Sequence, residues 1–209
     1  MKPFDGRVGT AVVLLACAAG TLAGRAGAMS YRPPVVPELG NASQGQLRFY
    51  AQPCCYRGPA GKQRVELSYT VGYDQLQLLG DSTGYRGGFT FAVIVYDRHG
   101  EQVAGDSWER TIAGRDLPAV QRRDSSVWGT VQLALAPGSY RLAVNCSDAN
   151  SQRSGELAAE LAVPPFDGAC ALSGIALRRS SGHDTLPWPA ARYGDIAAPL
   201  LASCEAYCR

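Results

Sequence analysis

The sequence predicts an all-β protein whose centre is an antiparallel β-sandwich of the immunoglobulin-like type. Three observations favour this fold class: apolar residues recur at every second position, turn-forming residues separate the apolar runs, and sustained helical periodicity is absent between Gly45 and Pro164. The chain has 209 residues, of which 46% are hydrophobic, so it is long enough to bury a core. We place the sandwich domain at residues 46–164.

The first residues have the layout of a secretory signal peptide rather than that of a folded helix. Lys2 and Arg7 precede an apolar run that starts at Val8, and no later segment is apolar for long enough to span a bilayer. We therefore expect the chain to be exported, to the periplasm or the outer membrane of a bacterium.

Two processing sites remain open in this segment. The small residues AGA at 26–28 fit signal-peptidase cleavage, which makes residues 1–28 the signal peptide. Alternatively, LLAC at 14–17 resembles the lipobox of bacterial lipoproteins, which makes residues 1–16 the signal peptide. In the second case Cys17 becomes the lipidated N-terminus and attaches the chain to a membrane.

The next segment, residues 29–45, is rich in proline, glycine and small polar residues, which predicts an extended tether. Regular alternation begins beyond it. In RVELSYTVGY (64–73) one face of the expected strand carries the apolar side chains Val65, Leu67, Tyr69, Val71 and Tyr73. Residues 89–96 are apolar on both faces, as in a central strand, and a turn is expected at 97–100.

Four further alternating runs complete the sandwich. DSWERTI (106–112) and VWGTVQLAL (127–135) predict two strands, and the second ends at a Pro-Gly turn. A hairpin follows, because apolar residues alternate on both sides of the loop 147–155: Tyr140, Leu142, Val144 and Cys146, then Leu157, Ala159, Leu161 and Val163.

The hairpin decides how Cys146 is interpreted. The alternation places Cys146 on the apolar face and Asp148 in the loop beyond the end of the strand. A thiol buried among apolar groups has a raised pKa and is a poor nucleophile. We therefore interpret Cys146 as a core or disulfide residue and not as a catalytic nucleophile.

Cysteine use is consistent with export. The chain has seven cysteines, and either processing route removes Cys17 from the pool, which leaves Cys54, Cys55, Cys146, Cys170, Cys204 and Cys208. In an oxidising compartment these residues can form up to three disulfides, and Cys54, Cys55, Cys146 and Cys170 are all candidates. The sequence leaves their pairing open, but neighbouring cysteines are poor partners, as are two cysteines four residues apart on one strand, about 13 Å from each other.

A separate unit is expected after the sandwich, because consecutive prolines at 164 and 165 cannot continue a ladder inside a sheet. We expect a strand in 170–180 and a loop in 181–200, and residues 201–209 look like the start of a second module. Residues 165–209 are too few to form an independent sandwich, so we interpret them as an incomplete second β module and the chain as a fragment or a product terminated early.

Four segments resemble, in the same order, the N-terminal β-sandwich region of the bacterial GWxTD-domain proteins. They are RVELSYTVGYDQLQLL (64–79), VIVYDRHGEQVAGDSWERTI (93–112), PGSYRLAVNCSDANSQRSG (137–155) and ARYGDIAAPLLASCEAY (191–207). In that family a C-terminal domain carries the Gly-Trp-x-Thr-Asp motif, which this chain lacks. The resemblance implies an exported, envelope-associated, β-rich protein, and it supplies no catalytic residues.

These observations favour a non-enzymatic module of the cell envelope that binds another protein or acts as a structural spacer. The net charge of +2 argues against a nucleic-acid partner. The chain has no C-x-x-C pair, and its two histidines lack ligand-like spacing, so we expect no metal and no other cofactor.

Two alternatives stay open. An envelope-polymer-binding domain, for carbohydrate or peptidoglycan, would use exposed aromatic residues such as Trp108, Trp128 and Tyr193. A hydrolase fragment would need a histidine near Cys146 or a carboxylate pair. His99 is expected in a turn and His183 in a loop, and Asp106 and Glu109 are expected on opposite faces of one strand.

Overall fold

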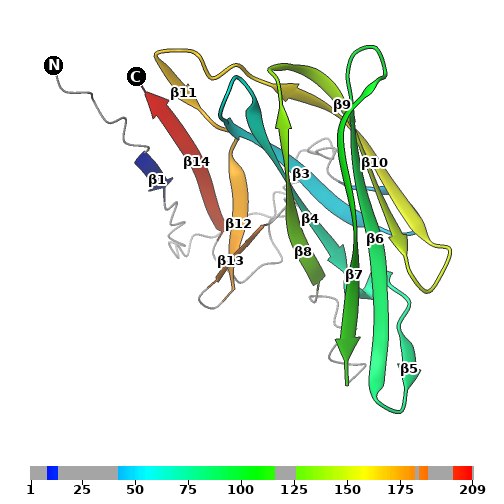
Figure 1. Ribbon diagram of the computed structural model, residues 1–209. Helices are drawn as coiled ribbons and strands as arrows, with labels where there is room; N and C mark the ends of the chain where they lie inside the picture. Colours follow the sequence, from blue (N-terminus) through cyan, green and yellow to red (C-terminus); the bar gives the residue numbers. More distant parts are fainter. Residues whose placement is uncertain (1–8, 14–41, 116–125, 182–183, 188–199, 209) are drawn as a thin grey trace, which may run out of the picture.

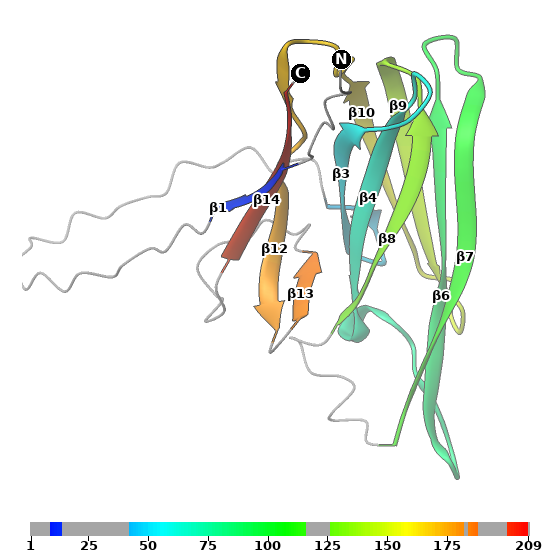
Figure 2. The same cartoon turned by 60° about the vertical axis from the view of Figure 1, so that its left-hand side comes forward.

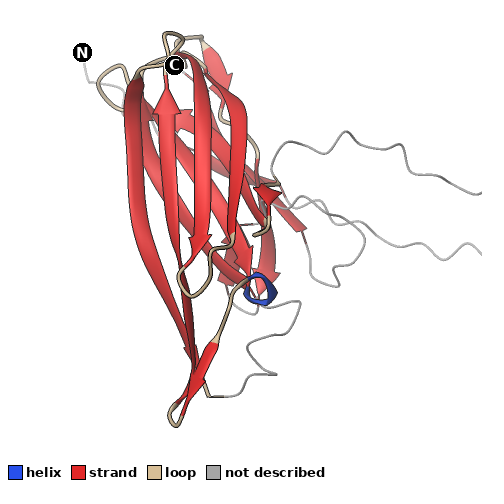
Figure 3. Cartoon of the chain, turned by 90° about the vertical axis from the view of Figure 1, so that its right-hand side faces the viewer, coloured by secondary structure: helices blue, strands red, loops and turns tan. Residues whose placement is uncertain are grey.

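The structure is a computed structural model, and it describes residues 9–13, 42–115, 126–181, 184–187 and 200–208. Within these ranges nearly every regular element is a β-strand, and the 3-10 turn η1 at Tyr73–Gln75 is the one helical element (Figure 3). The strands form three antiparallel sheets stacked in layers (Figures 1 and 2). The predicted all-β antiparallel sandwich is therefore confirmed. No helix in the described ranges is long and apolar enough to cross a membrane.

The large sheet forms one outer layer. Its strands are ordered β2–β10–β9–β6–β5, and β7 pairs with the other side of β6. The bounds are β2 (Gln44–Gly45), β5 (Leu79–Asp81), β6 (Gly84–Tyr96), β7 (Gln102–Gly114), β9 (Gly138–Asp148) and β10 (Ser154–Val163). The central position of β6, flanked by β7 and β9, agrees with the apolar run predicted at 89–96.

The small sheet forms the middle layer. It consists of β3 (Phe49–Arg57), β4 (Gln63–Gly72) and β8 (Ser126–Leu135), with β4 in the centre. Burial alternates along β4 as the sequence predicts. The end of β3 departs from alternation, since Cys54, Cys55 and Tyr56 are all buried. The next layer covers this strand from the outside, which explains why β3 lacks a clean period-two pattern.

The core lies between the large and small sheets and is rich in aromatic rings. Tyr69 of β4 stacks on Phe91 of β6 with ring centroids 4.2 Å apart, and Phe49 meets Phe91 edge-on at 5.3 Å. Trp108 of β7 closes one side, where its Nε1–H donates a 3.0 Å hydrogen bond to the hydroxyl of Tyr69. Full burial of one such apolar side chain stabilises a fold by roughly 1.5–3 kcal/mol.

The C-terminal sheet forms the third layer and packs against the outer face of the small sheet (Figure 2). It consists of β1 (Gly9–Val13), β11 (Cys170–Leu172), β12 (Ala176–Ser181), β13 (Asp184–Pro187) and β14 (Leu200–Cys208). β14 pairs with β11 and β12 on one side and with β1 on the other. The expectation of a loop throughout 181–200 is wrong at β13, which pairs with β12.

Polar contacts join the C-terminal sheet to the small sheet. The guanidinium of Arg64 lies 3.0 Å from the carboxylate of Glu205. The hydroxyl of Tyr207 accepts a 2.9 Å hydrogen bond from the backbone N–H of Arg57 and donates a 2.6 Å bond to Glu205. Phe166, from the connection after β10, packs edge-on against the ring of Tyr207 at 5.3 Å. Residues far apart in the sequence therefore fix β14 on the sandwich.

Candidate functional site

The outer face of the large sheet is hollowed. The hollow has a volume of about 620 Å³ and lies over β6, β9 and β10, with β2 along one side. Its floor contains the small or aliphatic residues Ala92, Ile94, Ala143 and Ala158. These residues stand at the outward positions of their strands, since their neighbours Val93, Val144 and Leu157 are buried in the core. Short side chains on the floor leave room for groups from a partner.

Polar groups lie around this apolar floor. Asn145 and Glu156 line the hollow, and the amide oxygen of Asn145 accepts a 2.9 Å hydrogen bond from the hydroxyl of Ser147. Beyond them on the same sheet, the guanidinium of Arg141 lies 4.9 Å above the ring of Tyr96. An apolar floor with a polar margin is the usual arrangement of a protein-binding surface. Sequence reasoning missed the hollow, although the apolar outward positions of residues 89–96 were its signal.

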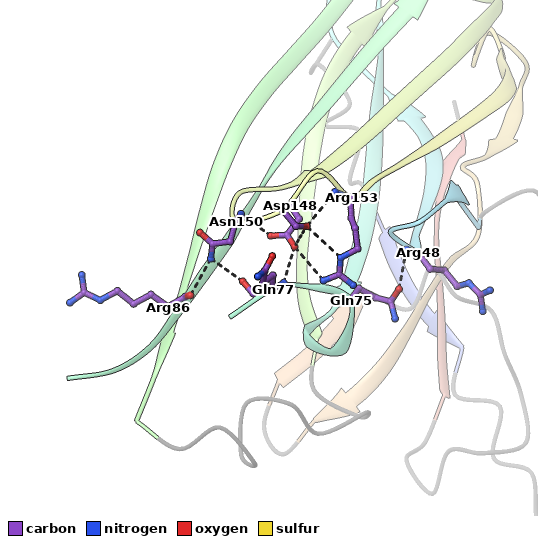
Figure 4. Close-up of polar contacts among 8 residues, drawn as sticks. Arg48, Gln75, Gln77, Arg86, Asp148, Asn150 and Arg153 are labelled. Carbon is purple, nitrogen blue, oxygen red and sulfur yellow. Dashed lines mark hydrogen bonds and ion pairs between the residues drawn. The ribbon is translucent and has the colours of Figure 1, made fainter. Parts of the chain in front are cut away.

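A second polar cluster lies at the end of the β9–β10 hairpin and centres on Asp148 (Figure 4). The expectation that Asp148 lies in the loop is wrong: it is the last residue of β9, and its side chain is 0% exposed. The carboxylate accepts hydrogen bonds from the backbone N–H of Gln77 at 2.8 Å, from the hydroxyl of Ser151 at 2.7 Å and from the backbone N–H of Asn150 at 3.1 Å. Arg153 adds an ion pair at 3.4 Å.

These contacts keep Asp148 ionised. Burial by itself would raise the pKa of this carboxyl, but the hydrogen bonds from Asn150, Ser151 and Gln77, with the charge of Arg153, lower it below the ordinary value. The amide of Asn150 also donates to the backbone carbonyls of Gln77 and Arg86, at 2.9 and 3.2 Å. Every donor around the carboxylate comes from a turn or a neighbouring segment, so the cluster serves to fix these segments together.

Burial makes the thiols of Cys54, Cys55 and Cys146 poor nucleophiles. Cys146 is 0% exposed, and burial, followed by the nearby charge of Asp148, raises its pKa to about 12. Burial raises the pKa of the Cys55 thiol to about 11, and this thiol donates to the backbone carbonyl of Ala162 at 3.7 Å. Burial also raises the pKa of Cys54. The core interpretation of Cys146 agrees with this placement.

The remaining cysteines divide between the C-terminal sheet and the N-terminus. Cys170 is exposed on β11, while Cys204 and Cys208 both lie on β14. Cys204 and Cys208 therefore share one strand. Four residues on an extended strand span about 13 Å, which is too far for a direct disulfide between them. Cys17, the candidate lipidation site, falls outside the described residues.

The candidate hydrolase residues do not converge. Asp106 is opposite the buried Val93 and Glu109 is opposite Thr90, so the two carboxylates face opposite sides of the large sheet, as predicted. His99 lies in the exposed turn after β6, where its backbone N–H donates to Asp97. His183 falls outside the described residues. Among the residues that the structure describes, no three His, Cys, Asp or Glu side chains form a group that could hold a metal ion.

The three candidate sugar-binding aromatics have different environments. Trp108 packs on Tyr69 and Phe91 with ring centroids 5.6 and 5.2 Å away, so its ring belongs to the core margin. Trp128 on β8 is 44% exposed. Tyr193 falls outside the described residues. Of the two tryptophans, Trp128 alone offers an open ring.

Comparison with known proteins gives no family: no family model matches the chain, and no curated protein matches it.

Proposed function

We propose that this chain is a non-enzymatic module of the bacterial cell envelope that binds another envelope protein through the hollow of the large sheet. The observation that carries the proposal is the apolar floor formed by Ala92, Ile94, Ala143 and Ala158 on an outward sheet face. A sheet face turned to solvent normally carries polar side chains, so apolar outward positions favour contact with a partner. The signal-peptide pattern of the first residues supports the envelope location, and cleavage at either site would remove β1 from the C-terminal sheet.

Site-specific photocrosslinking tests this proposal. A photoreactive amino acid is placed at Ala143, on the floor of the hollow, in cells that produce the full chain. The matched control is Val103, which is exposed on β7 of the same sheet but does not line the hollow. We expect one discrete adduct with an envelope protein from position 143 and none from position 103. Absence of an adduct, or the same adducts from both positions, would contradict the proposal.

A steric variant and cell fractionation complete the test. Ala158→Arg places a long charged side chain in the hollow from an exposed position of β10, so it should abolish the adduct from position 143 while the unfolding temperature stays unchanged. Recovery of the chain in the cytoplasmic fraction would contradict the envelope location. Labelling with a fatty acid that is lost in Cys17→Ser would favour the lipoprotein route over cleavage after Ala28.

Binding of an envelope polymer is the second candidate function, and the exposed ring of Trp128 favours it. An open indole can stack on a sugar ring. Co-sedimentation of the full chain with insoluble peptidoglycan, lost in Trp128→Ala and kept in Ala158→Arg, would favour this function over the first.

Membership of the GWxTD-domain proteins also stays a prediction. The gene sequence beyond the codon for Arg209 tests it: an in-frame continuation that reaches a Gly-Trp-x-Thr-Asp segment would support membership, and a stop codon followed by an unrelated gene would weaken it.

A further inference from the structure

Cys170 and Cys208 lie directly opposite one another on the adjacent antiparallel strands β11 and β14. Such cross-strand residues have Cα atoms about 4.5–5.5 Å apart, and their side chains share one face of the sheet. A disulfide needs Cα atoms roughly 4.4–6.8 Å apart, so the register alone fits the bond. The two thiols are also within hydrogen-bonding reach of each other. Both residues are exposed, so an oxidant can reach them.

The other described cysteines are poorly placed to compete for this pair. Cys204 lies four residues from Cys208 along β14, which corresponds to about 13 Å on an extended strand. Cys54, Cys55 and Cys146 are buried. Glu205 and Tyr207 point toward the small sheet, so Cys208 points to the opposite face of β14, away from the buried cysteines.

We propose that Cys170 and Cys208 form a disulfide when the chain meets a disulfide-bearing oxidant. The thiolate of one cysteine attacks the oxidant's S–S bond, which breaks to give a mixed disulfide and release one thiol. The second cysteine then attacks the protein sulfur of the mixed disulfide and displaces the oxidant's other thiol. Two electrons and two protons pass from the cysteine pair to the oxidant, and one S–S bond forms in the protein.

The bond would fix the end of β14. Tyr207, the neighbour of Cys208, anchors this strand to β3 by accepting a hydrogen bond from the backbone N–H of Arg57. A covalent link from Cys208 to β11 restrains the same strand from its other face. Oxidation would therefore join β14 covalently to β11 within the C-terminal sheet, and reduction would leave β14 held by noncovalent contacts alone.

Peptide mapping of the full chain tests the pairing. The reduced protein is incubated in a buffer of oxidised and reduced glutathione, denatured, alkylated with iodoacetamide and digested with trypsin. Cys170 falls in the peptide 154–178, whereas Cys204 and Cys208 fall together in the peptide 193–209. We expect these two peptides joined, with the alkyl group on Cys204, and we expect the joined species to disappear after reduction.

Matched serine variants assign the bond. Cys204→Ser should keep the joined peptides, and Cys208→Ser should abolish them and leave Cys170 alkylated. The proposal would be overturned if Cys170 and Cys208 were both alkylated in the oxidised wild type, or if Cys170 were joined to Cys204 or to a cysteine of β3 or β9. A cross-link that survives in Cys208→Ser would overturn it as well.

Discussion

The carboxylate of Asp148 and the backbone N–H of Gln77 are joined by a 2.8 Å hydrogen bond, although 71 positions separate the two residues in the sequence. Gln77 belongs to the segment between η1 and β5, and Asp148 ends β9. The bond therefore connects the turn of the β9–β10 hairpin to the chain that leaves the small sheet (Figure 4). A buried carboxylate is stable in such a place because several donors satisfy it.

Asp148→Asn should destabilise the protein by about 1–3 kcal/mol, because the donors around the carboxylate would lose a charged acceptor that they cannot replace with water. The free energy of unfolding from urea denaturation measures this change. Asp81→Asn is the matched control, since Asp81 also accepts bonds from Thr83 and Gly84 but lies at the exposed end of β5. We expect a clearly smaller loss there, and equal losses would contradict the structural role of Asp148.

The same carboxylate should make stability depend on acid pH. The pKa of Asp148 is lower in the folded chain than its ordinary value, so the folded state binds this proton less readily than the unfolded state does. The stabilisation is complete above the unfolded pKa of about 3.9 and is lost as the pH falls through the folded value. The free energy of unfolding should decline more steeply below pH 4 in the wild type than in Asp148→Asn, and parallel declines would contradict this assignment.

The alternating sequence pattern predicts the strands that have one buried face and one more exposed face. β4, β9 and β10 alternate cleanly and were predicted for that reason. β3 was not predicted, because the C-terminal sheet covers its outer face and it carries Pro53. A strand covered on both faces has no period-two signal, and β3 also lacks the continuous apolar run that identified residues 89–96 as a central strand.

Leu142→Ala should cost about 2–5 kcal/mol, because the side chain is buried between the two sheets and its removal leaves a cavity. Val103→Ala is the control, since Val103 is 47% exposed on β7 and should change stability by no more than about 0.5 kcal/mol. Thermal or urea unfolding of both variants measures the difference. Similar costs would show that Leu142 does not lie in the core.

Cys146 should react slowly with iodoacetamide in the folded, reduced protein. Its side chain is buried, and burial followed by the charge of Asp148 raises its pKa to about 12, so the thiolate is scarce near neutral pH. Cys208 is exposed and serves as the internal reference. Mass spectrometry after timed alkylation should show Cys208 modified long before Cys146. Equal rates would contradict the core position.

The candidate site shows a further difference between pattern and structure. Asp148 stands two positions after Cys146, so the alternation continues through it, but a charged residue beside turn formers suggested that the strand had ended. The donors that make its burial possible come from Gln77 and from the hairpin turn, and the sequence does not reveal a contact between segments so far apart. The hollow of the large sheet was not predicted for a related reason. Its shape depends on how neighbouring strands place their short side chains together.

Gly155→Ala should be strongly destabilising, because an added Cβ would overlap the backbone carbonyl oxygen of Leu47. That contact brings the chain before β3 against β10, and a rigid backbone atom cannot move aside as a side-chain tip can. We expect a loss of at least about 2 kcal/mol in the free energy of unfolding. Gly138→Ala is the control, since its added Cβ would meet the ring of Tyr140 at an ordinary distance of 3.5 Å. Equal effects would contradict the close approach at Gly155.

Tyr207→Phe should loosen the C-terminal sheet while the sandwich stays intact. The hydroxyl of Tyr207 accepts from the backbone N–H of Arg57 and donates to Glu205, and burial followed by the bond to Glu205 raises its pKa to about 12. Phenylalanine keeps the ring against Phe166 but leaves the Arg57 N–H without its acceptor, at a cost of about 1–3 kcal/mol. Hydrogen exchange should become faster in β14 and remain unchanged in β6 and β9.

The matched control for this last change is Tyr140→Phe, in which the lost hydroxyl donates to the carbonyl of Ala136 at an exposed position of the sandwich. Exchange in β14 should be the same in this variant as in the wild type. Because both variants lose one tyrosine hydroxyl, a difference between them reports on the position of that hydroxyl and not on the chemistry of the substitution. Unchanged exchange in β14 of Tyr207→Phe would show that its hydrogen bonds do not hold the C-terminal sheet, and faster exchange throughout β6 and β9 would show that Tyr207 supports the sandwich itself.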